Sequence, residues 1–434
     1  MNTLLAPPPL SAGLNFRLST MMFLQYAIWG AWLPLLWPFL TEHRGLAAGE
    51  VGNIFAVGAI GAIIAPFIAG QIADRWFSTE KFLAISHILG GALVWQLATI
   101  DAYGGFLIFS LIYSVIYSPT LSLTNSLSFH HLPDRDRDFG KVRIWGTVGW
   151  IAAGIAIGQW LLHSHTPANE TKEVIQAAQF AGMADAFRLS GILGVLMGFF
   201  CFALPNTPPS QGQSRSATRE AWWAIRKQPL LTLFLLAVPV SCIHQFYFVH
   251  TAGFLGNLQA SAEGLATKIN AVLGVGGGGL MTIGQMSELL VLALIPTLAK
   301  SLSRKTLLAI GLIAYAGRMA LFANADAVGL SGVLAGVALH GLCFGCFIFV
   351  AFMIVDEETT DDVRASAQSL FNLVIIGIGI IVGSQIATKA TEWATIDGDL
   401  SFNELFSYPM YASLVCLLVL VLFYPSKGNQ ELEQ

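Results

Sequence analysis

Charged residues are scarce in this chain. Only 11% of its 434 residues are Asp, Glu, Lys or Arg, whereas 55% are hydrophobic. Soluble domains usually contain about 25% charged residues, so the composition excludes an ordinary soluble protein and indicates an integral membrane protein. The formal net charge of -4 also argues against a nucleic-acid partner.

Cysteine is rare, and an N-terminal signal is lacking. All five cysteines lie within apolar runs, which argues against a disulfide framework: Cys201, Cys242, Cys343, Cys346 and Cys416. Cys343 and Cys346 have no further His or Cys at a spacing that would complete a metal site. We therefore predict that both side chains only pack in the apolar interior, and we expect no bound metal. The N-terminus has neither a basic segment nor a cleavage site, which predicts a short uncleaved tail.

The chain is rich instead in long apolar runs. A helix of about 20 residues crosses the roughly 30 Å hydrocarbon core of a bilayer. With that ruler we predict twelve spans, at about 16–40, 50–72, 82–100, 105–127, 141–162, 187–204, 229–254, 272–299, 305–323, 329–354, 364–388 and 405–424. A Pro-, Ser- and Gln-rich basic stretch follows the sixth span. The fold class is therefore an all-α integral membrane protein with two six-helix halves, 1–204 and 229–434, joined by a cytoplasmic linker at 205–228.

Lys and Arg are unevenly distributed between the two sides of these spans. An even number of spans places both termini on the same side. If that side is cytoplasmic, the cytoplasmic segments carry 16 of the 22 Lys and Arg residues and the opposite side carries 5. Because insertion retains positive charge in the cytoplasm, both termini are predicted to be cytoplasmic. Only Arg318 lies deep within a span, where we expect a structural pair with a polar group of another helix.

Two polar faces interrupt the apolar spans. Arg143, Thr147 and Trp150 share one face of the fifth span, and Gln285 and Glu288 share one face of the eighth. Such side chains are costly against lipid, so both faces are expected to border protein or a water-filled cavity. A carboxylate there must be paired, protonated or beside water, which makes Glu288 the candidate for proton coupling. A permanent pair of Glu288 with Arg143 or Gln285 is the alternative.

Other polar residues leave two interpretations open. His244 and His340 lie within spans, where each either takes part in coupling or stays a neutral hydrogen-bonded imidazole. An acidic cluster follows the tenth span and consists of Asp356, Glu357, Glu358, Asp361 and Asp362. It either forms a gate with Arg364 or Arg135 or is a solvated loop.

One loop between the second and third spans carries a motif, Gly70-Gln-Ile-Ala-Asp74-Arg75. It resembles the G-x-x-x-D-R/K loop of the major facilitator superfamily, in which the acid and the base latch neighbouring helix ends during alternating access. The resemblance implies a gating role for Gly70, Asp74 and Arg75. It also implies a transporter whose site lies between two duplicated halves.

Further blocks, in order along nearly the whole chain, resemble the bacterial nucleoside:proton symporter family of that superfamily. They are Phe23-Leu-Gln25-Tyr-Ala-Ile-Trp29-Gly, Tyr117-Ser-Pro119-Thr120-Leu, Arg143-Ile-Trp145-Gly-Thr147-Val-Gly, Gln285-Met-Ser-Glu288 and Arg364-Ala-Ser-Ala-Gln368. The resemblance implies that the chain imports nucleosides by proton symport in the bacterial cytoplasmic (inner) membrane. It is then expected to be no enzyme, to need no cofactor beyond the proton gradient, and to act as a monomer.

The resemblance also implies a substrate site, residue by residue. Matching positions are Arg143, Thr147, Trp150, Gln245, Gln285, Glu288 and Phe344. Three positions depart from the family pattern: Phe248 replaces an Asn, His340 replaces a Tyr, and Gly345 replaces an Asp. The aromatic side chains would stack on a base, and the amides, the hydroxyl and the carboxylate would bind a ribose.

Loss of the acid at Gly345 puts the cargo in doubt. A transporter of the same fold that carries a sugar or another polyol is therefore an alternative. A membrane sensor without transport activity is disfavoured, because the sequence shows no soluble signalling domain.

Overall fold

The computed structural model describes residues 8–68, 78–208, 218–260 and 264–425, and these are almost entirely helical. Within these ranges, eleven helices are long and apolar enough to cross a membrane. The third predicted span, α4 (Thr79–Leu97), is a helix of 19 residues but is not among the eleven. Its Glu80, Lys81 and His87 lower its mean hydropathy, although its length would cross about 28 Å.

Two groups of helices follow each other along the chain. The N-terminal helix group contains α1 (Ala12–Trp32), η1 (Leu33–Leu35), α2 (Leu36–Pro38), η2 (Phe39–His43), α3 (Ala48–Ile68), α4, α5 (Tyr103–His131), α6 (Arg135–Ser164), α7 (Lys172–Gly182) and α8 (Ala184–Cys201). After α9 (Thr218–Ala224), the C-terminal helix group contains α10 (Leu230–Ala260), α11 (Leu265–Leu273), α12 (Gly278–Ser301), α13 (Arg304–Ala323), α14 (Ala325–Ala338), α15 (His340–Leu342), η4 (Cys343–Phe349), α16 (Val350–Glu357), α17 (Asp361–Asn372), η5 (Leu373–Ile378), α18 (Gly379–Trp393), β1 (Thr395–Ile396), β2 (Asp399–Leu400) and α19 (Phe402–Phe423).

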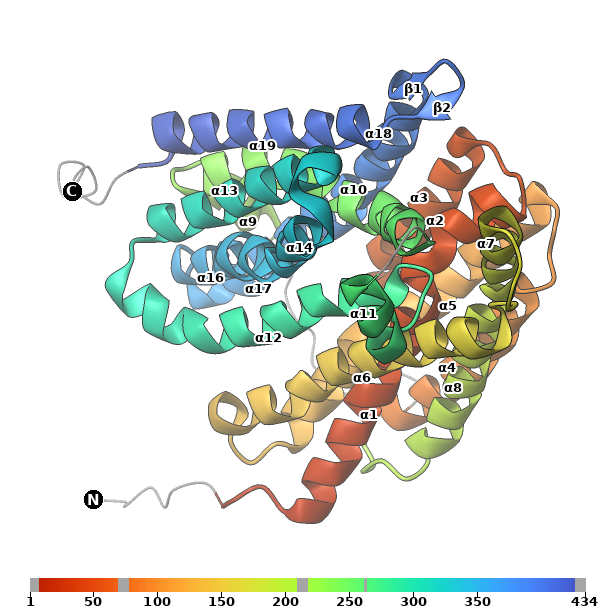
Figure 1. Cartoon of the computed structure of the whole chain (residues 1–434). Helices are drawn as coiled ribbons and strands as arrows, with labels where there is room; N and C mark the ends of the chain where they lie inside the picture. The colour runs from red at the N-terminus through yellow and green to blue at the C-terminus, as the bar shows by residue number, and fades with distance from the viewer. Residues whose placement is uncertain (1–7, 69–77, 209–217, 261–263, 426–434) are drawn as a thin grey trace, which may run out of the picture.

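Each group packs mainly on itself. In the N-terminal group α1 contacts α6 and α8, and α4 contacts α5 and α8; in the C-terminal group α13 contacts α19, and α10 contacts α18. Small residues permit close approach: a Cβ on Gly91 of α4 would lie 2.8 Å from the carbonyl oxygen of Gly191 on α8. The first and last described residues lie on the same side of the molecule (Figure 1).

The two groups meet at the end that lies away from the described chain ends. There α6 and α12 run side by side near α11 and then diverge toward the side of the termini (Figure 1). Contacts at this junction include the Asn53–Gln385 hydrogen bond (3.0 Å) and the rings of Trp37 and His250, whose centroids are 4.8 Å apart. The junction therefore joins helices that are far apart in sequence.

A glycine loop forms the part of this junction that contacts α6. Gly274, Gly276 and Gly277 have φ of 79°, 83° and 82°, values that L side chains rarely adopt. The sequence predicted that the eighth span begins near residue 272, but α12 begins at Gly278 because these glycines are not helical. The loop lets its backbone contact α6 directly.

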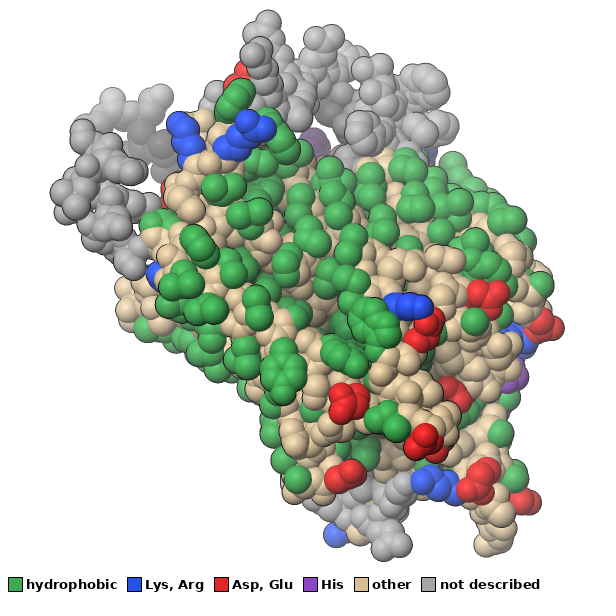
Figure 2. All heavy atoms as spheres, turned by 90° about the horizontal axis from the view of Figure 1, so that it is seen from above, with side chains coloured by type: hydrophobic (Ala, Val, Ile, Leu, Met, Phe, Trp, Pro, Cys, Tyr) green, Lys and Arg blue, Asp and Glu red, His purple; other side chains and the backbone are tan. Residues whose placement is uncertain are grey.

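Hydrophobic side chains are spread over the middle of the face seen in Figure 2, where charged ones are few. Along α19 the exposed side chains include Leu414, Val415, Leu418 and Leu422. This outward apolar surface is what a helix bundle requires in lipid. The short amphipathic helices α7 and α11 were not predicted, because they are too short to register as spans.

Candidate functional site

The two predicted polar faces lie opposite each other. A Cβ on Gly154 of α6 would lie 2.9 Å from Thr282 of α12, so the antiparallel helices are nearly in contact at this level. Thr147 lies seven residues from Gly154, and Glu288 six residues from Thr282, in the direction in which the helices diverge. At a rise of about 1.5 Å per residue, Thr147 and Glu288 are therefore nearly equally far along their helices from the contact between Gly154 and Thr282. Arg143 and Glu288 interact electrostatically across the gap between the two groups.

The start of α6 sets the position of Arg143. Asp134 caps the helix by accepting a hydrogen bond from the backbone N–H of Arg137 (3.1 Å). Two turns on, the half-buried Arg143 guanidinium lies 4.1 Å from the ring centroid of Tyr26 on α1, at cation–π distance. Arg143 therefore does not simply extend toward solvent. Sequence reasoning missed Tyr26, although it lies in one of the blocks that carried the family resemblance.

An aromatic series crosses from one helix group to the other. Trp150 packs edge-on against Trp29 of α1 and Phe248 of α10, with centroids 6.4 Å apart in both pairs. Trp29 in turn lies 5.8 Å from Tyr117 of α5. A Cβ on Gly30 would lie 2.8 Å from the Cα of Trp150, so the glycine permits this close contact. Trp29 and Tyr117 were not named as site residues, although both lie in the resembling blocks.

His340 connects the polar face of α12 to α15. Its Nε2 lies 3.4 Å from Nε2 of Gln285 and 3.6 Å from Oε2 of Glu288. The His340 side chain is 2% exposed and the residue Gln285 6% exposed, whereas the Glu288 side chain is 15% exposed. The structure thus brings Gln285, Glu288 and His340 together, with Glu288 the most accessible of the three.

Arg318 on α13 belongs to the same cluster. Its Nη1 lies 3.1 Å from Nδ1 of His340, and its guanidinium lies over the rings of Tyr247 (4.4 Å) and Tyr315 (5.1 Å). The prediction that Arg318 pairs with a polar group of another helix is confirmed. The partner is itself a predicted site residue, so Arg318 lies beside the predicted site.

The remaining predicted site residues make fewer contacts with this cluster. Gln245 on α10 is buried and has no hydrogen-bond partner among the described residues, and Phe248 contacts His340 edge-on at 6.2 Å. Phe344 is half-buried in η4 and makes no ring contact with another described aromatic side chain. Gly345 is buried, and a Cβ there would lie 2.6 Å from Cγ1 of Val291 on α12. The described backbone therefore leaves no room for a carboxylate at 345.

Gating roles were predicted for the Gly70 loop and, as one interpretation, for the acidic cluster after the tenth span. Gly70, Asp74 and Arg75 lie outside the described residues. In the acidic cluster, Glu357 accepts from Nε and Nη2 of Arg304 (2.9 and 2.6 Å), and Asp356 pairs with Arg364 (3.4 Å). Arg135 forms no ion pair with the described side chains of this cluster, Asp356, Glu357 and Glu358, and its Nε donates to the carbonyl oxygen of Phe129 (2.9 Å).

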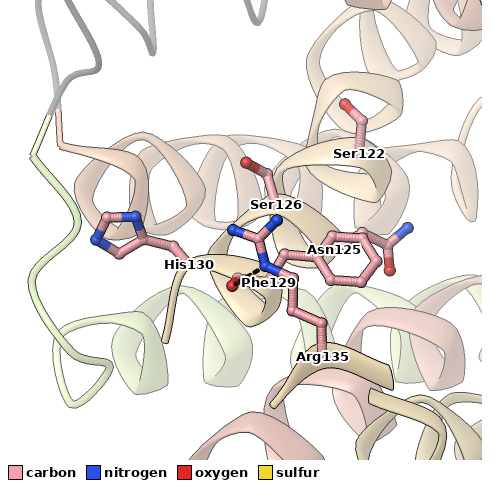
Figure 3. A pocket seen from close by; sticks show the side chains of 6 residues that line it. All are labelled: Ser122, Asn125, Ser126, Phe129, His130 and Arg135. Atoms are coloured by element: carbon pink, nitrogen blue, oxygen red, sulfur yellow. Dashed lines mark hydrogen bonds between the residues drawn. The ribbon is translucent and has the colours of Figure 1, made fainter. Parts of the chain in front are cut away.

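Two cavities lie away from the aromatic series. The first, of about 460 Å³, is lined by Ser122, Asn125, Ser126, Phe129, His130 and Arg135 (Figure 3). The second, of about 290 Å³, lies beside Arg304 and Glu357 and is bordered by Tyr424. Burial, and then the charges of Glu358 and Glu357, raise the pKa of the Tyr424 hydroxyl above its ordinary value, so the phenol stays protonated. Within the described residues, no group of His, Cys, Asp and Glu is arranged to hold a metal ion.

The chain is similar to known nucleoside transporters along nearly its whole length. The model of a family described as "Nucleoside H+ symporter" matches residues 12–429. A putative nucleoside transporter, YegT of Escherichia coli K12, is 33% identical over 431 residues, which cover 95% of this chain and 94% of YegT. The xanthosine permease of E. coli K12 is 25% identical over 432 residues, which cover 96% and 97% of the two chains. A crystal structure of the nucleoside transporter NupG matches the fold with a TM-score of 0.80 at 24% identity, covering 94% of this chain and 98% of NupG.

Proposed function

We propose that this chain, which belongs to the nucleoside H+ symporter family, imports nucleosides together with protons by alternating access. Its relatives and its structural neighbour are transporters rather than enzymes. The observation that carries the proposal is the opposition of two polar helix faces, one from each helix group, at one depth. Transporters with two such groups bind their substrate between them.

The chemistry of the opposed faces fits a nucleoside. A flat base is bound by stacking, and Trp150 and Phe248 offer aromatic faces from the two groups. A ribose presents hydroxyls that donate and accept, for which Thr147, Gln245 and Glu288 provide complementary groups. Buried polar atoms without a hydrogen-bond partner cost about 1–3 kcal/mol each, and a polyhydroxyl ligand would lower that cost for Gln285, whose Oε1 is unpaired.

In this proposal the helix groups are the two moving parts. Residues 1–204 and 229–434 form the halves and 205–228 the linker, and α4 completes a count of twelve membrane-spanning helices. Because Lys and Arg concentrate on the side of the termini, that side is cytoplasmic in the bacterial inner membrane. The glycine-loop junction then closes the opposite, outer side, and the described arrangement faces inward.

Energy for uptake would come from the proton gradient, without a cofactor. Glu288 is the proposed proton carrier, because it is the carboxylate on the polar face of α12 and it is accessible enough to exchange a proton with water. The rival role for Glu288 is a permanent structural pair with Arg143. A sugar or another polyol remains the alternative cargo, supported by the absence of a carboxylate at Gly345.

Transport by the purified protein in proteoliposomes tests the proposal. Uridine, adenosine, xanthosine and xylose, each radiolabelled, are compared with an acidic exterior and with a protonophore present. We expect at least one nucleoside to accumulate only when the gradient is intact, with the protein acting as a monomer. Gradient-driven accumulation of xylose alone would establish the alternative cargo, and accumulation of no nucleoside would overturn the proposal.

A further inference from the structure

Arg318 is a charged side chain in an unusual setting. It is 0% exposed, and no described carboxylate lies within ion-pair distance of it. Its charge lies between the rings of Tyr247 and Tyr315, and its Nε and Nη2 have no hydrogen-bond partner among the described residues. A buried guanidinium with so few partners is costly, so a purely structural role leaves its presence unexplained.

The single hydrogen bond of Arg318 determines the state of His340. A guanidinium only donates, so its Nη1 donates to Nδ1 of the imidazole (3.1 Å), and Nδ1 must carry a lone pair. The ring is then neutral and its proton lies on Nε2. This N–H points toward Oε2 of Glu288 at 3.6 Å and toward the amide of Gln285, whose Nε2 lies 3.4 Å away. Two donors cannot share a hydrogen bond, so this tautomer requires the Gln285 amide to turn until its unpaired Oε1 faces the imidazole.

Packing prevents the imidazole from turning over. Tyr247 stacks on one side with centroids 4.7 Å apart and an interplanar angle of 21°, and His244 stacks at 5.4 Å and 27°. A Cβ on Gly284 of α12 would lie 3.0 Å from the Cβ of His340, so α12 closes a further side. The ring orientation is therefore set before any ligand binds.

We propose that Arg318 is a positioning residue of the transport site, which holds His340 as the neutral Nε2–H tautomer directed at Glu288 and Gln285. His340 is then a hydrogen-bond donor and not a proton carrier. When Glu288 is ionised it accepts from His340, and when Glu288 is protonated the imidazole donates to Gln285 instead. Proton binding and release thus fall to Glu288 alone. This consequence for coupling rests on the proposed function, whereas the tautomer itself does not.

Several titratable or charged groups surround this imidazole. His244 and Tyr247 stack on it from α10, Arg318 donates to it from α13, and Glu288 lies beside it on α12. Tyr315 is hydrogen-bonded to Nδ1 of His244 (2.7 Å), and Cys343 lies next to the site in η4. Arg143 of α6 acts on Glu288 across the gap. Arg318 is the only member of this set that contacts Nδ1 of His340.

Solid-state ¹⁵N NMR of histidine-labelled protein in liposomes tests the tautomer directly. The His340 signals are those that disappear in His340→Gln. We expect an unprotonated Nδ1 and a protonated Nε2 at every pH from 5 to 8, and a titrating ring in Arg318→Met. A wild-type His340 that titrates in this range, or that carries its proton on Nδ1, overturns the proposal, and this result is decisive even if Arg318→Met does not fold.

Transport by the same variants tests the consequence. Gln at 340 can accept from Arg318 and donate to Glu288 but cannot titrate, so uptake by His340→Gln, whatever its rate, should keep the pH dependence of wild type. Arg318→Met should lose about tenfold and acquire a new pH dependence, and it should add no new pH dependence in the His340→Gln background. An equal, pH-independent loss in both backgrounds would indicate a merely structural Arg318 and overturn the proposal. If no nucleoside is transported while the NMR result is as expected, the proposed function fails and the tautomer stands.

Discussion

The backbone N–H of Val275 donates a hydrogen bond to the carbonyl oxygen of Gly158, with 3.0 Å between the two atoms, and so joins the glycine loop before α12 to α6. The two helix groups touch backbone to backbone here. The helix backbone is accessible here because Gly158 has no side chain, and a Cβ on it would lie 2.7 Å from the carbonyl oxygen of Leu273. The closure of this end of the molecule therefore depends on glycine.

Gly274→Ala is expected to open this junction. Gly274 has φ of 79°, and a Cβ there would overlap the backbone of Gly158. Backbone strain of about 1–3 kcal/mol combines with that overlap to destabilise the closed arrangement. Spin labels at Gly49 and Lys389, on opposite sides of the junction, should show a longer mean distance in the variant.

Gly398→Ala is the matched control for this measurement. Gly398 also has positive φ, 96°, but a Cβ there would meet nothing within 4 Å. It should lower the unfolding temperature through strain and leave the label distance unchanged. If both variants changed the distance equally, the overlap with Gly158 would not be what matters.

The spans and the two polar faces could be predicted from the sequence because apolar length and helical spacing are local properties. The position of α12 relative to α6 could not be predicted in the same way, although the resemblance placed Glu288 and Thr147 in one substrate site. It depends on the glycine loop, whose positive φ angles and contact with Gly158 are set by tertiary packing. The sequence shows a run of glycines, but it does not show which backbone these glycines contact.

Arg318 shows why part of the site was missed. Its place deep in a span predicted a polar partner, but spacing along the chain does not indicate which helix supplies it. His340 lies 22 positions further on and reaches Arg318 only because α14 and α15 fold back along α13. Likewise Tyr26 and Trp29 are ordinary aromatic residues in a span until α6 is packed against α1.

Trp150 is expected to contribute to affinity through its ring. Trp150→Ala removes the aromatic surface between Trp29 and Phe248 and should weaken nucleoside binding about threefold to tenfold, while Trp150→Phe should retain most of it. Isothermal titration calorimetry of the purified protein measures this. Trp145→Ala, on the same helix but 44% exposed, is the control and should bind normally. Normal affinity in Trp150→Ala would remove Trp150 from the site.

Arg143 is expected to act in binding rather than in folding. Arg143→Ala should weaken nucleoside affinity while expression and membrane insertion stay normal. Because its guanidinium lies on the face of Tyr26, Tyr26→Phe should be neutral and Tyr26→Ala should cause a smaller loss, about 0.5–1 kcal/mol. Expression in membranes and binding affinity are measured together. Loss of insertion in Arg143→Ala would instead support a structural, orientation-setting role.

Glu288→Gln separates coupling from binding. The amide keeps the size of the side chain but cannot release a proton, so accumulation against a gradient should be abolished while exchange of labelled for unlabelled nucleoside continues. Glu404→Gln, an exposed acid at the start of α19, is the matched control and should transport normally. Accumulation that persists in Glu288→Gln would show that another group couples the proton.

Gly345→Asp tests whether this chain can accept the acid that its resemblance led us to expect there. Gly345 is packed against Val291, and a Cβ would lie 2.6 Å from its Cγ1, so the substitution both overlaps a neighbour and buries a charge without a partner. We expect Gly345→Asp to lower the unfolding temperature and to reduce uptake. Val291→Ala in the same protein should recover part of the stability, because it removes the overlap but not the buried charge. Improved nucleoside affinity in Gly345→Asp alone would contradict this expectation, because it would mean that η4 can turn position 345 toward the site. The absence of an aspartate at this position would then help to determine which cargo the chain binds.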